Sequence, residues 1–140
     1  MVDLLRTGRR GEQAAEFWRR LQQGGIAFQR CVDCGAVRFP PGPGCPSCGS
    51  AVTEWTEPHT QPVVVCWTVT RGGAKSRLPK RFASEVPYIL TLVRFPDVAG
   101  VLLPALLLEN SDDGLRSGAP VALAGGDSEY PRLTARLVRA

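Results

Sequence analysis

The sequence has little of what a self-sufficient enzyme needs. It contains one histidine, His59, in a proline-flanked stretch where we expect a solvent-facing side chain and not a metal ligand. It has no G-x-S-x-G elbow, no P-loop and no G-x-G-x-x-G after a predicted strand. Its carboxylates stand singly, apart from Asp112 and Asp113 in a polar loop. We therefore expect this chain to supply no catalytic residues of its own.

A long hydrophobic run and a strong excess of charge are also missing. The longest apolar stretch, Val98 to Leu108, is interrupted by Gly100 and Pro104 and is too short to span a bilayer. The 17 basic residues are mixed with 13 acidic ones, which falls short of the concentrated basic face of a nucleic-acid-binding protein. The composition, 44% hydrophobic and 21% charged, is that of a folded protein. Without a signal-peptide pattern before the cysteines, we expect a cytoplasmic protein with no membrane contact.

What the sequence does contain is cysteine in a metal-binding pattern. Two C-x-x-C-G knuckles stand ten residues apart and supply four thiolates: Cys31, Cys34, Cys45 and Cys48. Four thiolates at this spacing can close a tetrahedron around one ion, and a closed site of this kind favours structural Zn²⁺. Iron in a rubredoxin-like site has the same ligand set and stays an alternative. Two disulfides are a further alternative, against which a reducing compartment argues.

Residues 1–25 are predicted to form a lead-in and one amphipathic helix. Apolar side chains recur at the helical spacing i, i+3, i+4 and i+7 in Ala14, Phe17, Trp18 and Leu21, and Gly24-Gly25 ends the pattern. The adjacent aromatics have two interpretations: they cover a neighbouring module of this chain, or they contact a partner. We expect Phe17, Trp18 and Leu21 to form a partner interface.

The rest of the chain is predicted to form two β modules. Residues 26–57 make the four-cysteine ribbon, with short strands around the first knuckle and a further strand at 53–55. Residues 58–140 begin with a linker and continue as five strand-like runs separated by turn signals: 63–70, 88–95, 101–108, 120–124 and 133–138. Five short strands without a second helical period favour an OB-fold barrel. The predicted fold is therefore mostly β: an N-terminal helix, a zinc ribbon and a five-stranded OB-fold.

A long basic segment joins the first two barrel strands. Between Gly72 and Val86 it has no acid before Glu85 and carries four cations: Lys75, Arg77, Lys80 and Arg81. Such a segment is either a solvated loop or a grip for a phosphate-bearing ligand or an acidic partner surface. The fifth cysteine, Cys66, lies in an apolar strand pattern and is expected to be buried as a small hydrophobe.

The order of these motifs resembles that of a known family. A helix with Phe17-Trp18 precedes R-C-x-x-C-G (30–35), Phe39-Pro40-Pro41, C-P-x-C-G-S (45–50), Trp55, Cys66-Trp67-Thr68-Val69 and Val86-Pro87-Tyr88. This order is similar to that of the rubredoxin-like zinc ribbon plus OB-fold proteins associated with acyl-CoA metabolism, from about Phe17 to Val138. In place of a glycine-rich turn before the first barrel strand, this chain has the stiffer segment 58–62, with a proline at each end.

The resemblance implies a non-catalytic accessory subunit in a hetero-oligomer with a thiolase-superfamily enzyme. The partner enzyme would act on acyl-CoA thioesters, as a retro-aldol lyase of the type found in steroid side-chain degradation and lipid metabolism. Zinc would be structural, the helix and ribbon would dock on the partner, and the barrel would help to receive the CoA thioester. The cations at 75, 77, 80 and 81 would then meet CoA phosphates or acidic partner residues.

Three other functions stay open. The first is an accessory subunit of a polyketide acyltransferase or a hot-dog hydratase complex, which the same resemblance allows. The second is a single-stranded nucleic-acid-binding module, against which the predicted barrel strands argue because Val, Leu, Ile and Ala dominate them and Trp67 and Tyr88 are their main aromatics. The third is an electron carrier, which would need iron in the four-cysteine site.

Overall fold

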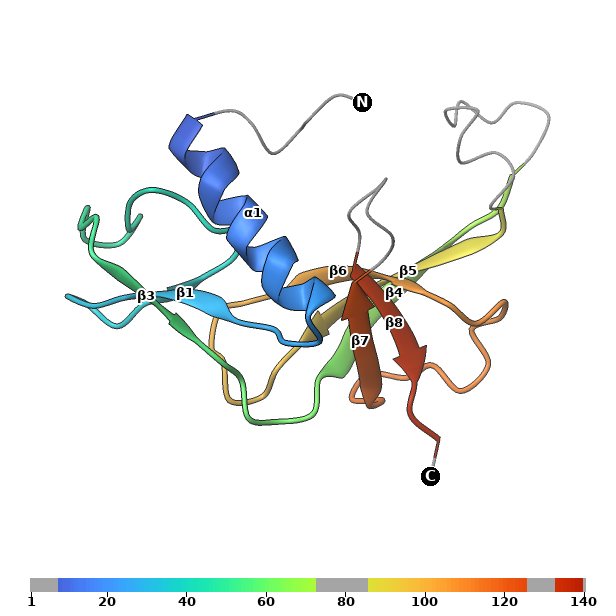
Figure 1. Ribbon diagram of the computed structural model, residues 1–140. Coiled ribbons are helices and arrows are strands. Elements are labelled where there is room, and N and C mark those ends of the chain that lie inside the picture. The colour runs from blue at the N-terminus through green and yellow to red at the C-terminus, as the bar shows by residue number, and fades with distance from the viewer. Residues whose placement is uncertain (1–7, 73–85, 126–132, 140) are drawn as a thin grey trace.

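The computed structural model describes residues 8–72, 86–125 and 133–139 (Figure 1). The helix α1 (Gly8–Gln22) comes first. The ribbon sheet has the strand order β2-β1-β3, with β1 (Phe28–Cys31), β2 (Val37–Arg38) and β3 (Thr53–Thr56). The second sheet has the order β4-β5-β6-β8-β7, with β4 (Val63–Thr70), β5 (Tyr88–Arg94), β6 (Leu103–Leu107), β7 (Val121–Gly125) and β8 (Leu133–Leu137).

The second sheet has the topology of an OB-fold. Strands β4, β5 and β6 form an antiparallel meander, β6 pairs with β8 in parallel, and β7 pairs with β8 antiparallel. The barrel closes where Val63 forms a bridge with Pro120, and the Val64 amide donates to the Ala119 carbonyl at 2.9 Å. A five-stranded, partly open Greek-key barrel of this order is the OB-fold. The predicted fold class is confirmed.

The helix α1 begins earlier than the sequence pattern predicts and ends where it predicts. Its C-terminus is closed by the Gly24 amide donating to the Leu21 carbonyl at 3.1 Å and the Gly25 amide donating to the Arg20 carbonyl at 3.0 Å. Gly24 has φ of 84°, the left-handed conformation that this cap requires and that glycine adopts without strain. The chain can therefore leave the helix directly towards β1.

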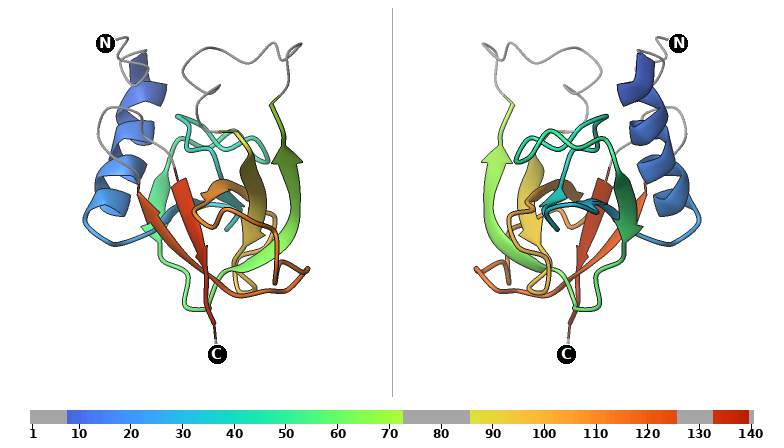
Figure 2. Two further views of the ribbon diagram at one scale, coloured as in Figure 1. Left: turned by 90° about the vertical axis from the view of Figure 1, so that its right-hand side faces the viewer. Right: turned by 90° about the vertical axis from the view of Figure 1, so that its left-hand side faces the viewer.

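One hydrophobic cluster joins the helix, the ribbon and the barrel. Phe17 of α1 lies against two ribbon aromatics, with its ring centroid 4.9 Å from that of Phe39 and 6.5 Å from that of Phe28. Leu21, one turn further on, packs over Gly125 of β7, where an added Cβ would come within 3.3 Å of the leucine Cγ. In Figure 2 α1 and β4 lie on opposite sides of the barrel. The segments predicted as modules, 1–25, 26–57 and 58–140, thus contribute to one shared core, and the division at these boundaries stays a prediction.

The segment predicted as a linker is tied to the barrel. The His59 amide donates to the Asp97 carboxylate at 2.7 Å, and the Thr60 hydroxyl donates to the other oxygen of the same carboxylate. These donors lower the pKa of Asp97, the Thr60 hydroxyl being the larger cause. Gln61 adds a hydrogen bond to the Val121 carbonyl. The ribbon and the barrel are thus connected by an anchored strap.

The prediction that Cys66 is buried is wrong. The register of β4 against β5 shifts between Val64 and Cys66, so the bulge reverses the alternation of side chains. Val64 is buried, and two positions later Cys66 is exposed. The sequence pattern of the strand does not reveal this extra residue. Among the described residues, no helix is both long enough and apolar enough to cross a bilayer.

Candidate metal centre and docking surfaces

The two knuckles are built in the same way. In the first, the Gly35 amide donates to the Cys31 carbonyl at 2.9 Å, and in the second the Gly49 amide donates to the Cys45 carbonyl at 2.8 Å. Gly35 and Gly49 have φ of 74° and 79°, which a residue with a Cβ rarely adopts. Each knuckle is therefore a tight turn that brings the two sulfurs of its C-x-x-C motif together.

The four thiols meet at one point, as the spacing predicts. All four sulfur atoms lie within 4.8 Å of one another. The Cys31 and Cys48 sulfurs are 3.6 Å apart, and so are those of Cys34 and Cys45. A zinc ion bound at about 2.3 Å by each sulfur of a tetrahedron would hold the sulfurs about 3.8 Å apart. The residues therefore fit a Zn²⁺ ion without a change of fold, and no coordination position is left open for a reaction.

Backbone amides favour the thiolate at the first cysteine of each knuckle. The amides of Cys48 and Ser47 donate to the Cys45 sulfur and lower the pKa of this thiol to about 6. The Cys34 amide lowers the pKa of Cys31 in the same way. At Cys48 the Ser50 amide lowers the pKa, but the hydrogen bond with the Cys31 sulfur, burial and the other two thiols raise it to about 12. A divalent cation would favour the thiolate at all four positions.

The comparisons with known proteins agree with this geometry. A family model described as the ChsH2 rubredoxin-like zinc ribbon domain matches residues 18–54. The solved structure of the Ltp2-ChsH2(DUF35) aldolase contains a chain that is 27% identical to this one, with a TM-score of 0.68. The match covers 89% of this chain and 94% of that one, so it includes the barrel. Residues 18–54 thus belong to the rubredoxin-like zinc ribbon family, and the chain joins this ribbon to an OB-fold barrel. The family is described as a zinc ribbon, which favours zinc over the iron alternative.

Two further relatives differ in how much they share with the chain. The probable enoyl-CoA hydratase alpha subunit of Thermomonospora curvata is 32% identical over 124 residues. That match covers 88% of this chain but 36% of the relative, so the chain spans about a third of the length of the curated protein it matches. A DUF35-family protein of unknown function from Sulfolobus solfataricus has a TM-score of 0.66 at 20% identity, covering 97% of this chain and 90% of that one. This second likeness supports the fold alone.

The three residues predicted to contact a partner differ in exposure. Phe17 and Leu21 are 2% and 5% exposed, because the ribbon aromatics and β7 cover them. The expectation of a direct partner contact therefore does not hold for these two side chains, which support the helix from inside. Trp18 is half-buried, with its ring edge-on to that of Phe17 at 5.3 Å. A partner contact stays a prediction for Trp18.

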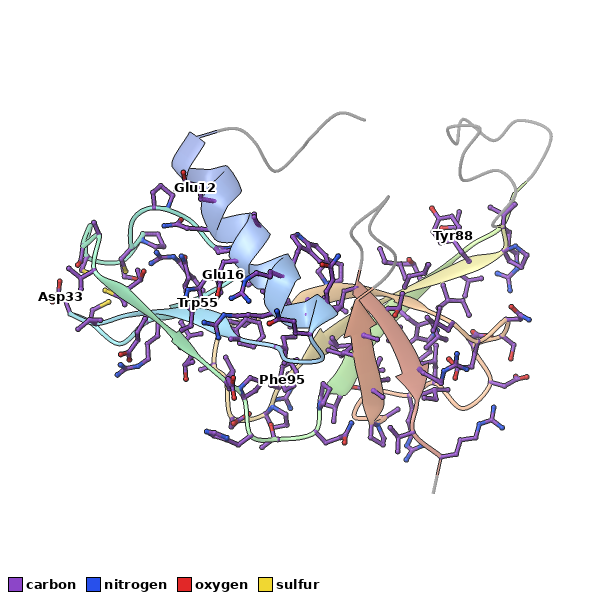
Figure 3. All side chains as sticks on the ribbon, in the orientation of Figure 1. Glu12, Glu16, Asp33, Trp55, Tyr88 and Phe95 are labelled. Carbon is purple, nitrogen blue, oxygen red and sulfur yellow. The ribbon has the colours of Figure 1, made fainter. Side chains whose placement is uncertain are left out.

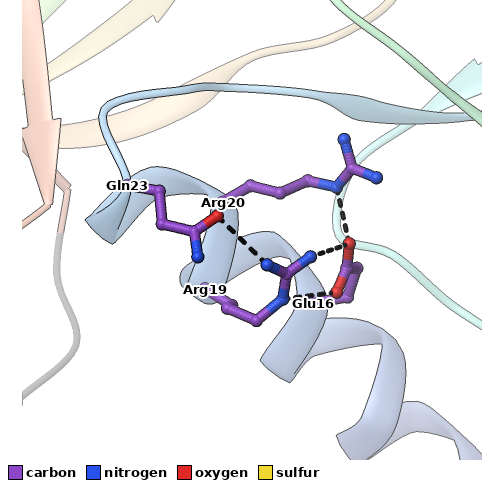
Figure 4. Close-up of polar contacts among 4 residues, drawn as sticks. All are labelled: Glu16, Arg19, Arg20 and Gln23. Atoms are coloured by element: carbon purple, nitrogen blue, oxygen red, sulfur yellow. Dashed lines mark hydrogen bonds and ion pairs between the residues drawn. The ribbon is translucent and has the colours of Figure 1, made fainter.

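A charged cluster on α1, beside β3 of the ribbon, is a feature that sequence analysis missed (Figure 4). Glu16 pairs with Arg19 and Arg20, each at 2.7 Å, and these two guanidinium groups lower the pKa of Glu16 to about 2. The Arg20 guanidinium also lies 5.3 Å from the ring centroid of Trp55 on β3. Figure 3 shows Glu16 above Trp55. The spacing of Glu16 from both arginines, i+3 and i+4, was the available signal.

Two other predicted site features have different outcomes. The four cations Lys75, Arg77, Lys80 and Arg81 lie outside the described residues, so their role as anion contacts stays a prediction. His59 is exposed in the strap between the modules, and no metal-ligand cluster of the described residues includes it. Figure 3 shows Asp33, in the first knuckle, and Tyr88, at the start of β5, at opposite ends of the molecule. The metal centre is therefore remote from this end of the barrel.

Proposed function

We propose that this chain is a non-catalytic accessory subunit of a hetero-oligomeric complex that acts on acyl-CoA thioesters. The observation that carries the proposal is its likeness to a chain of the Ltp2-ChsH2(DUF35) aldolase over 94% of that chain's length. The match to an enoyl-CoA hydratase alpha subunit supports acyl-CoA thioesters as the substrate class, because that name describes an enzyme acting on such a thioester.

In this proposal the chemistry belongs to the partner, a thiolase-superfamily enzyme. The reaction is a retro-aldol cleavage of a β-hydroxyacyl-CoA: the Cα–Cβ bond breaks, the hydroxyl proton leaves, and the Cα carbanion takes up a proton. The products are a shorter acyl-CoA and a carbonyl compound. The closed four-cysteine site suits this division of labour, because a zinc ion with four thiolates has no position for a water or a substrate.

The proposed role of this chain is to stabilise the partner and to help bind the CoA thioester. Its rigid arrangement favours such a role, because the helix, the ribbon and the barrel share one core and can present a fixed surface. The four cations between residues 75 and 81 are proposed to meet the CoA phosphates, as phosphate groups are bound by Lys and Arg through charge-assisted hydrogen bonds.

Coexpression tests this proposal. The chain is produced with the thiolase-superfamily protein encoded nearest to it, and the complex is measured by affinity copurification and light scattering. The purified complex and each separate subunit are then given a β-hydroxyacyl-CoA, and the shorter acyl-CoA is quantified. We expect cleavage by the complex and none by this chain alone. A partner that is stable and equally active without this chain would contradict the proposal.

A hydratase complex is the second candidate, favoured by the 32% identity to the hydratase alpha subunit. The relative is almost three times as long as the matched part, so a further domain or a separate subunit would carry the hydration of an enoyl-CoA. An enoyl-CoA hydration assay on the same preparations separates the two candidates. Hydration that requires this chain, without cleavage, would favour the second.

A further inference from the structure

The outward face of β5 and β6 is apolar although it faces solvent. In both strands alternate side chains are buried in the barrel, Ile89, Thr91 and Val93 in β5 and Leu103, Ala105 and Leu107 in β6. The side chains between them, together with the residues that flank β6, point outwards. We call this the outer barrel face: Leu90, Leu92, Leu102, Pro104, Leu106 and Leu108.

Strand pairing brings these residues together. Leu90 of β5 is the cross-strand partner of Leu106 of β6, and Leu92 is the partner of Pro104. On the other side of β5, Leu90 faces Thr68 and Leu92 faces Cys66 of β4. Directly paired residues of neighbouring strands lie on the same face of a sheet. The outer barrel face is therefore continuous across three strands, and none of these side chains is charged.

Exposed large hydrophobic side chains are few in the described part of the chain, and half of them lie on this face. Among the described residues six large hydrophobic side chains are classed as exposed, and three of them belong to this face: Leu90 at 40%, Leu102 at 49% and Leu108 at 45%. A strand that is apolar on both sides is typical of sheets that are covered on both sides. A contiguous exposed apolar patch on a folded domain marks an interaction site.

The aldolase complex indicates what covers this face. This chain covers 94% of the matched chain of that complex, so the counterpart of this chain there consists almost entirely of the same helix, ribbon and barrel. A contact with the other named component must therefore be made by these modules and not by an appended domain. Of the described surfaces, the outer barrel face has the composition of an interface core, because such cores are depleted of charge.

We propose that the outer barrel face docks on the catalytic acyl-CoA enzyme subunit, through an equally uncharged apolar surface of that subunit. This inference rests on the proposed function and adds to it the surface that the partner covers. A nucleic acid does not suit the face, since a strand-binding surface needs cations and stacking aromatics, whereas Arg94 at the end of β5 is the one outward cation on β4, β5 and β6.

A pair of matched double variants tests the assignment. Leu90→Arg with Leu108→Arg places two charges on the outer barrel face, and Val32→Arg with Val52→Arg places two on the ribbon, where these valines are 47% and 57% exposed. Both variants are coexpressed with the thiolase-superfamily protein of the complex. Zinc content and thermal unfolding confirm that each is folded, and titration calorimetry with the purified partner gives Kd.

We expect the barrel variant to bind at least about 100-fold more weakly and the ribbon variant to bind as the wild type does, because an unpaired charge is costly to bury. Equal loss in both variants, or no loss in the barrel variant while the wild type binds, would overturn the assignment and leave the proposed function standing. No binding by the wild type would overturn both.

Two further measurements on the chain alone test the other possible occupants of this face, a second copy of the chain and a nucleic acid. The first is light scattering. If the wild type is a dimer and the barrel variant is a monomer, the face belongs to a second copy and the assignment is wrong. Binding of an oligothymidine probe that the barrel variant loses would likewise overturn it in favour of nucleic acid.

Discussion

The ring of Phe28, on β1 of the ribbon, lies 5.8 Å from the ring of Phe95, which directly follows β5 of the barrel. The two rings are inclined at 66°, and the side chains are 1% and 5% exposed. In Figure 3 Phe95 lies between the ribbon and the barrel. Because each ring is buried by the other module as well as by its own, the stability of the ribbon and that of the barrel depend on one another.

Replacing Phe28 with alanine tests this dependence. Large-to-small substitutions of buried aromatics cost about 3–5 kcal/mol, and here both modules lose packing. We expect the variant to unfold in a single transition at lower denaturant concentration, followed by far-UV circular dichroism and by zinc release. Val32→Ala on the exposed side of the ribbon serves as the control, with a change within about 0.5 kcal/mol. Separate transitions for zinc release and barrel unfolding would show that the modules are independent.

The metal has a related consequence. Cys45→Ser removes one of four sulfurs, so we expect zinc content to fall from one ion per chain and the protein to lose stability, by several kcal/mol in order of magnitude. The loss should extend to the barrel, because Phe28 lies on the strand that leads into Cys31. Cys66→Ser is the matched control and should keep its zinc. Elemental analysis measures the metal directly, and one iron per chain in the wild type would contradict the zinc assignment.

The sequence pattern predicts most of the fold because the barrel strands have clear boundaries. The run Val63 to Thr70 matches β4 as predicted, and the other barrel strands agree within about two residues at their ends. The knuckles are equally clear, since C-x-x-C-G at this spacing leaves few ways to place four sulfurs. Local rules therefore determine both features.

The features that the sequence did not predict depend on long-range contacts. Whether Phe17 faces a partner or its own chain depends on where Phe39 and β7 lie, and the helical pattern is the same in both cases. The orientation of Cys66 depends on a bulge that only pairing with β5 reveals. The outer barrel face had a signal, since the stretch from Val101 to Leu108 is apolar at every position, including those that point outwards.

The Glu16 cluster gives a prediction for pH. The pKa of Glu16 is lowered from 4.5 to about 2 by hydrogen bonds from Arg19 and then Arg20. A carboxylate whose pKa is lower in the folded state than in the unfolded state stabilises the fold at pH values above its unfolded-state pKa. This stabilisation is lost as the pH falls through the folded-state pKa. We therefore expect the wild type to be more stable than Glu16→Gln at neutral pH. The stabilities of the two proteins should converge as the pH falls from about 4.5 to about 2.

Carbon-detected NMR of the Glu16 carboxyl group measures the same effect directly. Arg19→Gln should raise the pKa of Glu16 more than Arg20→Gln does, because the hydrogen bond from Arg19 is the larger cause. An unchanged titration of Glu16 in the double variant would show that the arginines do not cause the shift. High salt should reduce the stability difference between wild type and Glu16→Gln, since the pairs are partly exposed.

Alanine substitutions of the adjacent aromatics Phe17 and Trp18 on α1 are expected to have different effects on stability and on partner binding. Phe17→Ala should destabilise the chain by about 3–5 kcal/mol, because the ring is 2% exposed and contacts Phe28 and Phe39. Trp18→Ala should cost less stability and should weaken partner binding in the calorimetric assay if the half-buried ring contacts the partner. Comparable binding by wild type and a folded Trp18→Ala variant would refute the remaining interface assignment on the helix.

Thiol reactivity distinguishes Cys66 from the other four cysteines. Cys66 is exposed on the outward side of β4. It is the cross-strand partner of Leu92 and therefore lies beside the outer barrel face. With zinc bound, the four ribbon sulfurs are metal ligands, so an aromatic disulfide reagent should modify one thiol per chain quickly and all five only after denaturation with a chelator. Cys66→Ser should abolish the fast phase without changing zinc content.

The same reaction tests whether the partner covers the outer barrel face. If it does, binding of the partner should slow the modification of Cys66 in the wild type. In the control variant Val32→Arg/Val52→Arg, which keeps this face intact, the partner should slow the modification to the same extent. A fast phase that the partner leaves unchanged would place the contact elsewhere on the surface.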